Sequence, residues 1–416
     1  MRTPTTTDVF HNPLRYGDMR SWRQEVVGLH ADGPVHLIDA EGFSPFWVVI
    51  GHDAVMEVER QPALFTNEPV PVLANDAALE LQREQGMQIR TLIHMDRPDH
   101  TEYRKLTNDW FKPAAMAPMT ERLDELSRNA VETLEAAAID GVGELDFNTD
   151  VAVPYPLQVI LSILGLPADD YARMLVLTQE LFGAEDPDLQ REGSTPEDRM
   201  ATLMDFYQYF MSLSADRQAH PTGDLASLIA NGEIRGEPMA DLEKLGYYLI
   251  IATAGHDTTS AAMAEGMAQL AAHPEQLALL RDSPDLIGNA VEEMIRMASS
   301  VRHFMRTATE DTEVDGQAIA KGDWLMLNYA AANLDPNHFE RPLEFDVTRP
   351  NANKQIAFGF GIHFCLGAQL ARMELRSLFS HLVPRLASLE PAAEATTGRA
   401  TFVSGYKTLP IRYTLA

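Results

Sequence analysis

Apolar residues recur every three or four positions along most of the chain, which is the spacing that places side chains on one face of an α-helix. Strand-like runs are short and confined to two regions. The pattern predicts helices over 117–138, 154–165, 168–183, 197–216, 238–271, 274–282, 284–298 and 366–387. It predicts strands at 35–39 and 46–51, within 301–329, and again near 400–415. We therefore expect a mainly α fold with small β-sheets.

The composition is that of a protein with a large core. Hydrophobic residues make up 45% of the 416 positions, and no linker-like stretch or repeat divides them, which predicts a single domain over 1–416. The first residues carry no apolar run, and no window approaches the roughly 18 uninterrupted apolar residues of a spanning helix. One cysteine excludes an intramolecular disulfide and fits a reducing compartment. We expect a cytoplasmic protein without a membrane anchor.

The charge of the chain excludes one class of partner. The formal net charge is −28, and nucleic-acid binding needs a basic face, so we expect no nucleic acid partner. Beyond that, acidity bears on solubility and says little about function.

The single cysteine, Cys365, lies in the run F-G-F-G-I-H-F-C-L-G from Phe358 to Gly367. Gly359 and Gly361 permit a tight bulged loop that could press against a flat cofactor. Gly367 removes a side chain where the next helix would approach the same group. At that helix's N-terminus the backbone N–H groups favour a negative sulfur, and the thiolate is the form that ligates metal. For a lone cysteine the competing interpretation is a small buried hydrophobe.

A second run, I-I-A-T-A-G-H-D-T-T-S at 250–260, places an acid and a hydroxyl, Asp257 and Thr258, inside an apolar helix. Buried charges are costly unless they are paired or used. Gly255 weakens the helix by up to about 1 kcal/mol relative to alanine, which predicts a local distortion there. The alternative is an ordinary exposed or capping pair. His256 faces another direction and is interpreted as structural.

Both runs resemble motifs of the cytochrome P-450 family: F-x-x-G-x-H-x-C-x-G around the cysteine and A-G-x-D-T in the helix. The resemblance implies the P-450 fold, a triangular helical prism with haem b between the long central helix and the helix after the cysteine loop. It implies that Cys365 is the axial thiolate on the iron, a ligand that favours O–O cleavage. Phe358 would pack beside the sulfur, His363 would lie near a haem propionate, and Asp257 and Thr258 would deliver protons.

Further matches follow in the family's order. His100 and Arg104, four residues apart on one helical face, and Arg306 in F-M-R-T-A correspond to propionate partners. The run E-M-I-R and a later arginine imply a buried structural network of Glu293, Arg296 and Arg349. Two positions depart from the family pattern and leave local loop details open, namely Arg97 before the histidine and Leu334 in N-L-D-P.

The resemblance also predicts a substrate pocket and a lid. The pocket candidates are Ile250, Thr253, Ala254, Phe304, Phe402 and Val403. For each of them, plain core packing is the alternative. The acidic loop at 184–196 corresponds to the connection that covers the substrate entrance in the family. It is either a mobile lid or a surface loop without a role.

The chain is most similar to bacterial soluble members of the family, in the group that includes the terpineol-hydroxylating enzyme. This likeness rests on L-T-Q-E-L-F-G (177–183), A-T-A-G-H-D-T-T-S (252–260), P-E-Q-L-A-L (274–279), F-M-R-T-A (304–308) and D-T-E-V (311–314). It implies a monomeric monooxygenase that uses dioxygen and electrons from an iron–sulfur ferredoxin with an NAD(P)H-dependent reductase. A small, apolar monoterpenoid or alkyl-aromatic substrate is favoured.

Three other functions stay open at this point. They are hydroxylation of a larger lipid such as a fatty acid or steroid, direct use of peroxide, and non-catalytic haem-thiolate binding. The intact Asp257–Thr258 pair argues against the last two.

A group of basic residues falls in segments that the family places on the cysteine side of the haem. These residues are either a docking patch for an acidic electron donor or a set of scattered solvated charges. They are Arg104, Lys105, Lys112, Lys354, Arg372 and Arg376.

Overall fold

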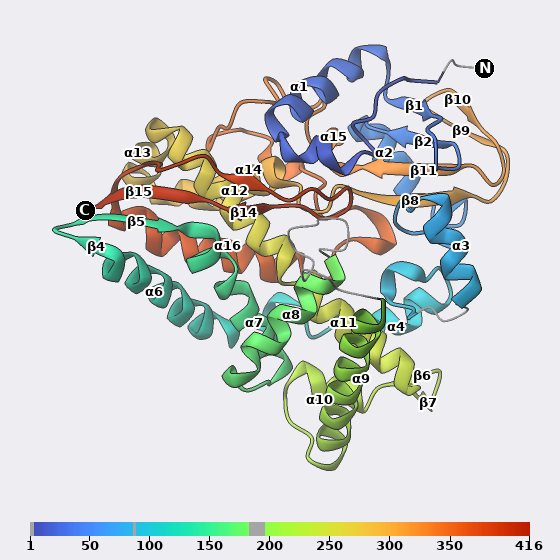
Figure 1. The fold of residues 1–416 in the computed structure, drawn as a ribbon, viewed down its shortest axis with the longest axis horizontal. Helices are drawn as coiled ribbons and strands as arrows, with labels where there is room; N and C mark the ends of the chain where they lie inside the picture. Colours follow the sequence, from blue (N-terminus) through green and yellow to red (C-terminus); the bar gives the residue numbers. More distant parts are fainter. Residues whose placement is uncertain (1–3, 86–88, 183–195) are drawn as a thin grey trace.

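The apolar run predicted as one long helix forms two consecutive helices, α11 (Asp241–Ala254) and α12 (Asp257–Ala272), separated by Gly255 and His256. The computed structural model describes residues 4–85, 89–182 and 196–416. In them the two helices cross the centre of a body with a roughly triangular outline (Figure 1). The Thr258 hydroxyl donates to the Ala254 carbonyl at 2.6 Å, a bond to the preceding turn that favours bending. The distortion expected at Gly255 is therefore a full break.

The central helices pack against a helical layer on the cysteine side. In α6 (Met119–Ala137), Leu123, Leu126, Ala130 and Leu134 are buried at three- and four-residue spacing, as an amphipathic helix requires. This layer and α12 share one hydrophobic core. Its other helices are α13 (Pro274–Asp282), α14 (Ile287–Ala298) and α16 (Ala368–Leu382).

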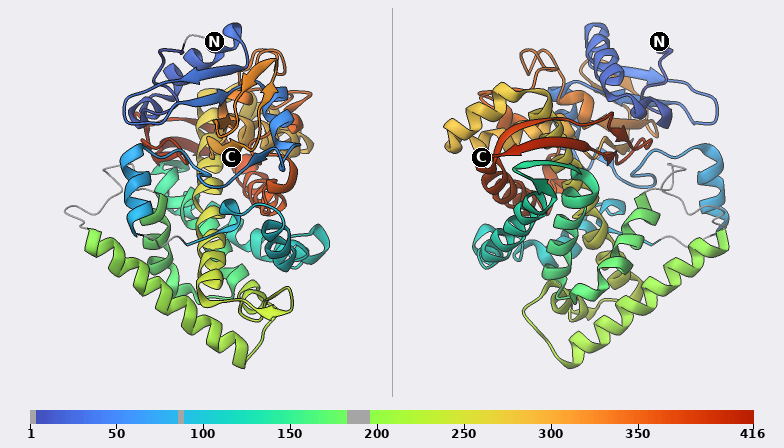
Figure 2. Two further views of the ribbon diagram at one scale, coloured as in Figure 1. Left: turned by 90° about the vertical axis from the view of Figure 1, so that its right-hand side faces the viewer. Right: turned by 60° about the vertical axis from the view of Figure 1, so that its left-hand side comes forward.

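A second helical group lies around α11. Figure 2 shows α9 (Pro196–Ala219) as one long, nearly straight helix along the lower edge of the molecule. The candidate lid at 184–196 lies outside the described residues except for its last residue. The other helices of this group are α4 (Asp99–Asn108), α7 (Pro154–Leu164), α8 (Tyr171–Phe182) and α10 (Leu225–Ala230).

A five-stranded sheet forms the N-terminal corner, in the order β1-β2-β11-β8-β3. Alternate residues of its strands enter different cores, since Val48 and Met326 pack on one face while Val49 and Leu327 pack on the other. The strands are β1 (Val35–Ile38), β2 (Phe46–Val49), β3 (Phe65–Thr66), β8 (His303–Ala308) and β11 (Trp324–Asn328). Its neighbouring helices are α1 (Met19–Leu29), α2 (His52–Glu59), α3 (Asp76–Gln85) and α15 (Tyr329–Ala332).

A second sheet corrects the predicted end of the last long helix. The helix expected over 366–387 ends at Leu382, and a turn containing Pro384 leads into a strand. Proline cannot donate the helical hydrogen bond, so it ends the helix. The sheet order is β12-β15-β5-β4, and only β15 lies in a predicted strand region. The strands are β4 (Ala138–Ile139), β5 (Val142–Asp146), β12 (Leu386–Pro391) and β15 (Pro410–Leu415).

Short elements complete the described chain. The remaining helix and strands are α5 (Pro113–Met116), β6 (Glu233–Ile234), β7 (Glu237–Pro238), β9 (Thr312–Val314), β10 (Gln317–Ile319), β13 (Thr396–Thr397) and β14 (Tyr406–Thr408). Single helical turns occur at Pro13–Gly17, His30–Asp32, Leu92–His94, Asn148–Ala152, Ala168–Asp170, Pro284–Leu286, Ala352–Lys354, Gly361–His363 and Val383–Arg385.

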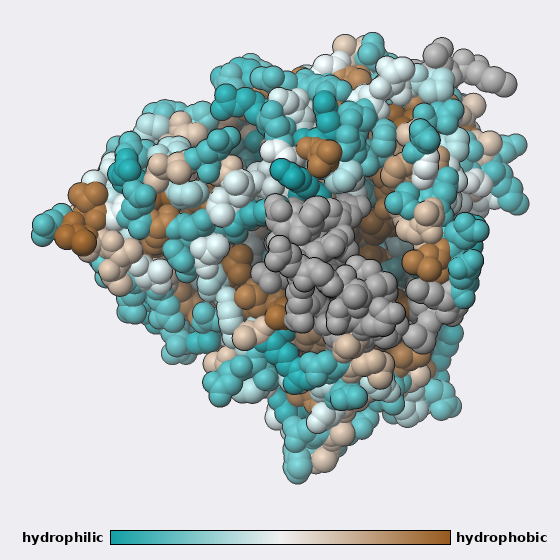
Figure 3. Space-filling view, in the orientation of Figure 1, coloured by the Kyte–Doolittle hydropathy of each residue, from teal (hydrophilic) through white to brown (hydrophobic). Residues whose placement is uncertain are grey.

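The face in Figure 3 is mostly hydrophilic, with apolar residues scattered among polar ones. Brown atoms gather at its left tip, where Figure 1 places the β4–β5 hairpin, and Ile139 and Val142 of this hairpin are 80% and 50% exposed. Among the described residues, no helix combines the length and the apolar character needed to cross a membrane.

Candidate active site

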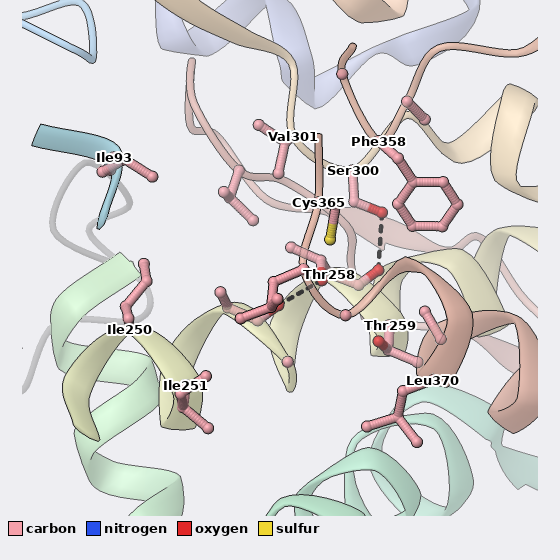
Figure 4. A pocket seen from close by; sticks show the side chains of 18 of the residues that line it. Ile93, Ile250, Ile251, Thr258, Thr259, Ser300, Val301, Phe358, Cys365 and Leu370 are labelled. Atoms are coloured by element: carbon pink, nitrogen blue, oxygen red, sulfur yellow. Dashed lines mark hydrogen bonds between the residues drawn. The ribbon is translucent and has the colours of Figure 1, made fainter. Parts of the chain in front are cut away.

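The predicted site residues meet at a cavity between the α11–α12 break and the cysteine loop. Cys365 lines it from one side, and Ile250, Ala254 and Thr258 line it from the central helices. Figure 4 shows Thr258 beside the break and the Cys365 sulfur directed into the same space. Residues more than one hundred positions apart in sequence therefore share one enclosure.

The cysteine loop owes its shape to two glycines. Gly359 and Gly361 have φ values of +67° and +69°, which side chains other than glycine rarely adopt. A Cβ on Gly361 would lie 2.4 Å from the Glu59 carbonyl oxygen, so a larger residue would displace the loop from α2. The Cys365 N–H donates to the Phe358 carbonyl at 2.9 Å and closes the loop. A Cβ on Gly367 would enter open space, which is consistent with a flat group approaching there.

The thiol of Cys365 is set between opposing influences. Burial raises its pKa, while the backbone N–H groups of Gly367 and Ala368 and the guanidinium groups of Arg104 and Arg372 lower it. At the start of α16, these N–H and guanidinium groups can therefore stabilise a negatively charged sulfur by hydrogen bonds and by positive charge. A metal ion bound to the sulfur would add the remaining stabilisation of the thiolate, because a coordinating thiol is deprotonated.

One wall of the cavity suits carboxylate groups. The rings of His100 and His363 lie 4.1 Å apart, and Arg104 lines the same wall while donating to the Phe364 carbonyl at 2.6 Å. Burial, with nearby arginines, lowers the pKa of His100 to about 4 and that of His363 to about 2, so both rings are neutral. The His363 Nε2 atom is buried with no hydrogen-bond partner among the described residues. The haem fits this wall, because its propionates would supply the missing partner.

Arg306 lies behind this wall and reveals a residue that the sequence analysis missed. It is not among the described residues that line the cavity; its guanidinium donates to the Glu59 carboxylate at 3.1 Å. The Tyr329 hydroxyl donates to the same carboxylate at 2.7 Å. Burial raises the pKa of Glu59, and Arg306 opposes that shift. Nothing in the spacing of Glu59 along α2 distinguished it from other helical acids, so only the tertiary structure could identify it.

The acid and hydroxyl of the second motif occupy different environments. Thr258 lines the cavity, and the Ser300 hydroxyl donates to its carbonyl at 2.9 Å (Figure 4). Asp257 does not line the cavity as far as the described residues show. Its side chain is 25% exposed and lies 3.0 Å from the Nδ1 atom of His256. The other ring nitrogen of His256 bonds to the Val153 carbonyl at 3.1 Å, so His256 connects the break to the segment before α7.

Most predicted pocket residues line the cavity, and one does not. Ile250, Ala254, Phe304, Phe402 and Val403 contribute to the walls, and the rings of Phe304 and Phe402 lie 5.3 Å apart.

The remaining predicted pocket residue, Thr253, lies outside the described lining of the cavity. Thr253 is buried, and its hydroxyl donates to the Leu249 carbonyl at 2.7 Å. It is absent from the described lining because the helix turns this position away from the cavity. The sequence analysis also missed several lining residues, which come from separate segments: Leu92, Ile93, Ile160, Ser300, Val301 and Glu374.

The predicted Glu293 network forms on the cysteine side of α14. Two nitrogens of Arg296 donate to the two Glu293 oxygens, each at 2.8 Å, and Arg349 Nε lies 3.0 Å from both oxygens. The side chains of Glu293 and Arg296 have no exposed area. The remaining N–H groups of Arg349 donate to backbone carbonyls, including that of Glu344 at 2.8 Å. The network therefore ties α14 to the segment that precedes the cysteine loop.

The basic residues of the candidate docking patch are largely paired. Lys105 lies 2.9 Å from Glu102, Lys112 lies 2.5 Å from Asp109, and Arg372 lies 2.7 Å from Glu292. Lys105 and Lys112 remain mostly exposed. The positive surface is thus interleaved with acidic side chains.

Comparisons with known proteins agree with this geometry. A sequence profile of the family described as Cytochrome P450 matches residues 285–394. The chain is 40% identical to cytochrome P450-terp from Pseudomonas sp, over 97% of this chain and 96% of that protein. It is 33% identical to linalool 8-monooxygenase from Pseudomonas putida, over 92% and 93% of the two chains. The crystal structure of CYP108D1 from Novosphingobium aromaticivorans superposes with a TM-score of 0.90 at 40% identity and covers 100% of both chains.

These findings confirm the predicted fold, the haem cofactor and the class of reaction. The break above the cavity, the cysteine at the start of α16 and the carboxylate-binding wall are together what a thiolate-ligated haem requires. The chain therefore belongs to the cytochrome P450 family and is a haem-thiolate monooxygenase.

Proposed function

We propose that this cytochrome P450 hydroxylates small to medium-sized apolar molecules, with monoterpenoids and alkyl-aromatic compounds as the favoured substrates. The observation that carries the proposal is the cavity wall opposite Cys365. Ile93, Ile250, Val301 and Phe402 present apolar side chains there. The Thr258 hydroxyl already donates to the Ala254 carbonyl, and the Ser300 hydroxyl already donates to the Thr258 carbonyl. The hydrocarbon part of a substrate can therefore lie against this wall without leaving either hydroxyl unpaired.

The similarity to a linalool 8-monooxygenase supports the monoterpenoid class, because linalool is a small monoterpene alcohol. Similarity of fold does not by itself fix the substrate, which depends on the side chains of the pocket. The substrate class is thus inferred mainly from the wall residues of this chain, with the similarity to the relative as additional support.

The roles of the site residues form part of the proposal. Cys365 ligates the haem iron, with Phe358 and Gly367 against the haem. His100, Arg104 and His363 hold the propionates, with Arg306 behind them. When bound, a haem with a thiolate ligand supplies dioxygen activation. Phe304 and Val403, with the residues of the wall, bound the substrate.

Thr258 and Asp257 are proposed to move protons from solvent to the cavity. The Thr258 Oγ1 atom holds a proton inside the cavity, and the neighbouring Asp257 carboxylate is partly exposed. His256 fixes the Asp257 side chain at 3.0 Å. A hydroxyl inside the cavity and a partly exposed acid next to it in sequence provide the two ends of a short proton path through water.

Electrons are proposed to come from an iron–sulfur ferredoxin with an NAD(P)H-dependent reductase. Exposed Lys105, Lys112 and Lys354 offer positive charge to an acidic protein, although nearby acids partly neutralise it. A monomer and a cytoplasmic location stay predictions.

A binding screen tests the substrate class. Monoterpenoids, alkylbenzenes, fatty acids and steroids are titrated separately into the haem-loaded protein, and the shift of the haem absorption band is recorded. We expect saturable shifts with the first two classes at the lowest concentrations. Tight binding of fatty acids or steroids alone would replace the proposal with a larger lipid as substrate.

The Thr258→Ala variant tests the proton path. We expect normal substrate binding. Most electrons from NADH should end in hydrogen peroxide and few in hydroxylated product, since the cavity would lose its proton-holding hydroxyl. Thr258→Ser keeps the hydroxyl and serves as the matched control. Unchanged coupling of NADH to product in Thr258→Ala would contradict the proposed role of Thr258.

A separate assay tests the peroxide-using alternative. Turnover of the wild type with peroxide alone, at a rate equal to that with ferredoxin, would favour that alternative.

A further inference from the structure

Outside the cavity, two histidines and an aspartate gather where α2 begins. The His52 and His338 rings are stacked, with their centroids 3.6 Å apart and their planes 10° from parallel. The Asp53 Oδ1 atom lies 3.7 Å from the His52 Nδ1 atom. One candidate ligand atom from each of the three residues falls within 4.8 Å of the others. The chemistry derived for the active site uses none of them.

The hydrogen bonds of His52 fix its protonation pattern. Its Nε2 atom lies 2.9 Å from the Lys354 carbonyl oxygen, which only accepts hydrogen bonds, so Nε2 carries the proton. In the neutral ring the lone pair is then on Nδ1. The side chain is only 3% exposed, and Nδ1 is buried with no hydrogen-bond partner in the part of the chain that the structure describes. Buried acceptors are normally satisfied, so this atom calls for a ligand.

A divalent transition metal matches this arrangement. Histidines that ligate metal commonly donate their other ring N–H to a backbone carbonyl, as His52 does to Lys354. Two imidazoles with one carboxylate form a ligand set for Zn²⁺, with a fourth position left for water. Tetrahedral bonds of the usual length place ligand atoms roughly 3.3 Å apart, and the His52–Asp53 separation is close to that.

His338 must move for all three ligands to converge. Parallel stacked rings direct their lone pairs side by side, so the His338 ring has to turn toward the Nδ1 atom of His52. His338 is only partly buried, and the Asp53 side chain is 97% exposed, so both can adjust. Asp335 and Lys354 also face the cluster, and with Asp53 they leave a net negative charge around it, which favours a cation.

We propose that His52, Asp53 and His338 bind one Zn²⁺ ion. The ion would join the first turn of α2 to the loop after α15. Through the His52–Lys354 bond it would also brace the segment that leads into the cysteine loop. This site is separate from the haem iron, and its role is to stabilise the fold around that loop.

The test measures zinc binding to the haem-loaded protein without a histidine tag. Isothermal titration with ZnCl₂ is done in excess Mg²⁺, which occupies sites made only of carboxylates on this acidic surface. We expect about one Zn²⁺ per chain by titration and by elemental analysis after gel filtration. We also expect zinc to raise the melting temperature. His338→Phe keeps a stacked ring but removes the ligand, and Asp53→Asn changes an exposed side chain.

Each variant should weaken zinc binding by at least about tenfold. Removing a residue that only hydrogen-bonds to a metal ligand already lowers metal affinity by about that factor. The control is His220→Phe, which removes an exposed histidine 3.3 Å from an aspartate elsewhere on the surface. It should bind zinc like the wild type. The proposal is overturned if the wild type shows no saturable binding in Mg²⁺, or if His338→Phe binds zinc with unchanged affinity and stoichiometry.

Discussion

The two sides of the cavity are built by different means. On the cysteine side, Glu293 has no exposed side-chain area and bonds two arginines at 2.8–3.0 Å, and Glu59 holds Arg306 and Tyr329. On the opposite side, the wall consists of apolar side chains such as Ile250 and Val301, contributed by separate segments.

This difference predicts that the two sides of the cavity tolerate substitutions to different degrees. Directional bonds between buried charges have narrow geometric limits, and removing one partner strands the other. Apolar contacts depend on volume and tolerate substitutions that conserve it. The cysteine side should therefore be the part that fixes the fold and holds the haem. The apolar side should be the part whose changes alter the substrate and leave the fold intact.

The largest effect is expected on the cysteine side, at Cys365 itself. Cys365→Ala should completely remove the absorption band that marks thiolate-ligated ferrous haem with bound carbon monoxide. No other described side chain at the cavity offers a thiolate. The reduced, carbon monoxide-treated spectrum measures this. Persistence of the band would show that another residue is the ligand.

A large stability effect is expected within the Glu293 network. Glu293→Gln keeps the shape but leaves Arg296 and Arg349 without their carboxylate, which should lower the free energy of unfolding by about 3–5 kcal/mol. Urea denaturation of the haem-loaded protein measures it. The control is Glu344→Gln, which removes an exposed carboxylate 2.6 Å from Arg341 and should cost at most about 1 kcal/mol. Equal losses in the two variants would contradict the contrast between buried and exposed pairs.

A pH-dependent effect of intermediate size is expected at His303, beside Phe402. Its Nδ1 donates to the Thr401 carbonyl and its Nε2 accepts from the Leu73 N–H, so the buried ring is neutral. Burial lowers its pKa to about 4, below its ordinary value of 6.5. Between these pH values the unfolded chain binds a proton that the folded protein does not.

Stability should therefore fall as the pH drops from about 6.5 to about 4, by up to about 3 kcal/mol from this group. The measurement is the difference between the wild type and His303→Gln in urea denaturation across that range. Other groups titrate in both proteins, so only the difference in slope is informative. Identical slopes would mean that His303 is not held neutral.

The smallest stability effect is expected on the apolar wall. Ile250→Phe fills part of the cavity and should change the free energy of unfolding by under about 1.5 kcal/mol. It should weaken binding of the bulkiest ligands by about 1–3 kcal/mol, measured by the shift of the haem band. Leu249→Phe introduces the same ring one residue away, at a buried position outside the described cavity lining. It should destabilise the fold while preserving the order of ligand affinities.

The sequence predicted the site residues of the two sides of the cavity to different extents. Around Cys365 the residues proposed to hold the haem are local, since Phe358, His363 and Gly367 all lie within ten positions. A loop of that kind shows itself in the order of its residues. On the apolar wall, Ile250 and Ala254 line the described cavity, as their register with the family predicted. Thr253 does not, because a shift of one residue turns a helical side chain by about 100°.

Secondary structure followed the same division. The long amphipathic helices were predicted from their periodicity, and the distortion at Gly255 was anticipated without its extent. Strands β4, β5 and β12 were missed because they are short and partly exposed, and pairing with β15 stabilises them. Contacts between distant segments leave little trace in the local pattern of polar and apolar residues.

The sequence by itself determined the family, the haem ligand and the reaction, because these depend on residue types at fixed local spacing. Only the tertiary structure decided that Glu59 holds Arg306, that His256 fixes Asp257, and that His52 faces His338 with an unpaired nitrogen. The physical reason is that electrostatic and hydrogen-bonding partners act over a few ångströms in space. In each of these cases except the adjacent His256 and Asp257, the fold joins positions more than two hundred residues apart.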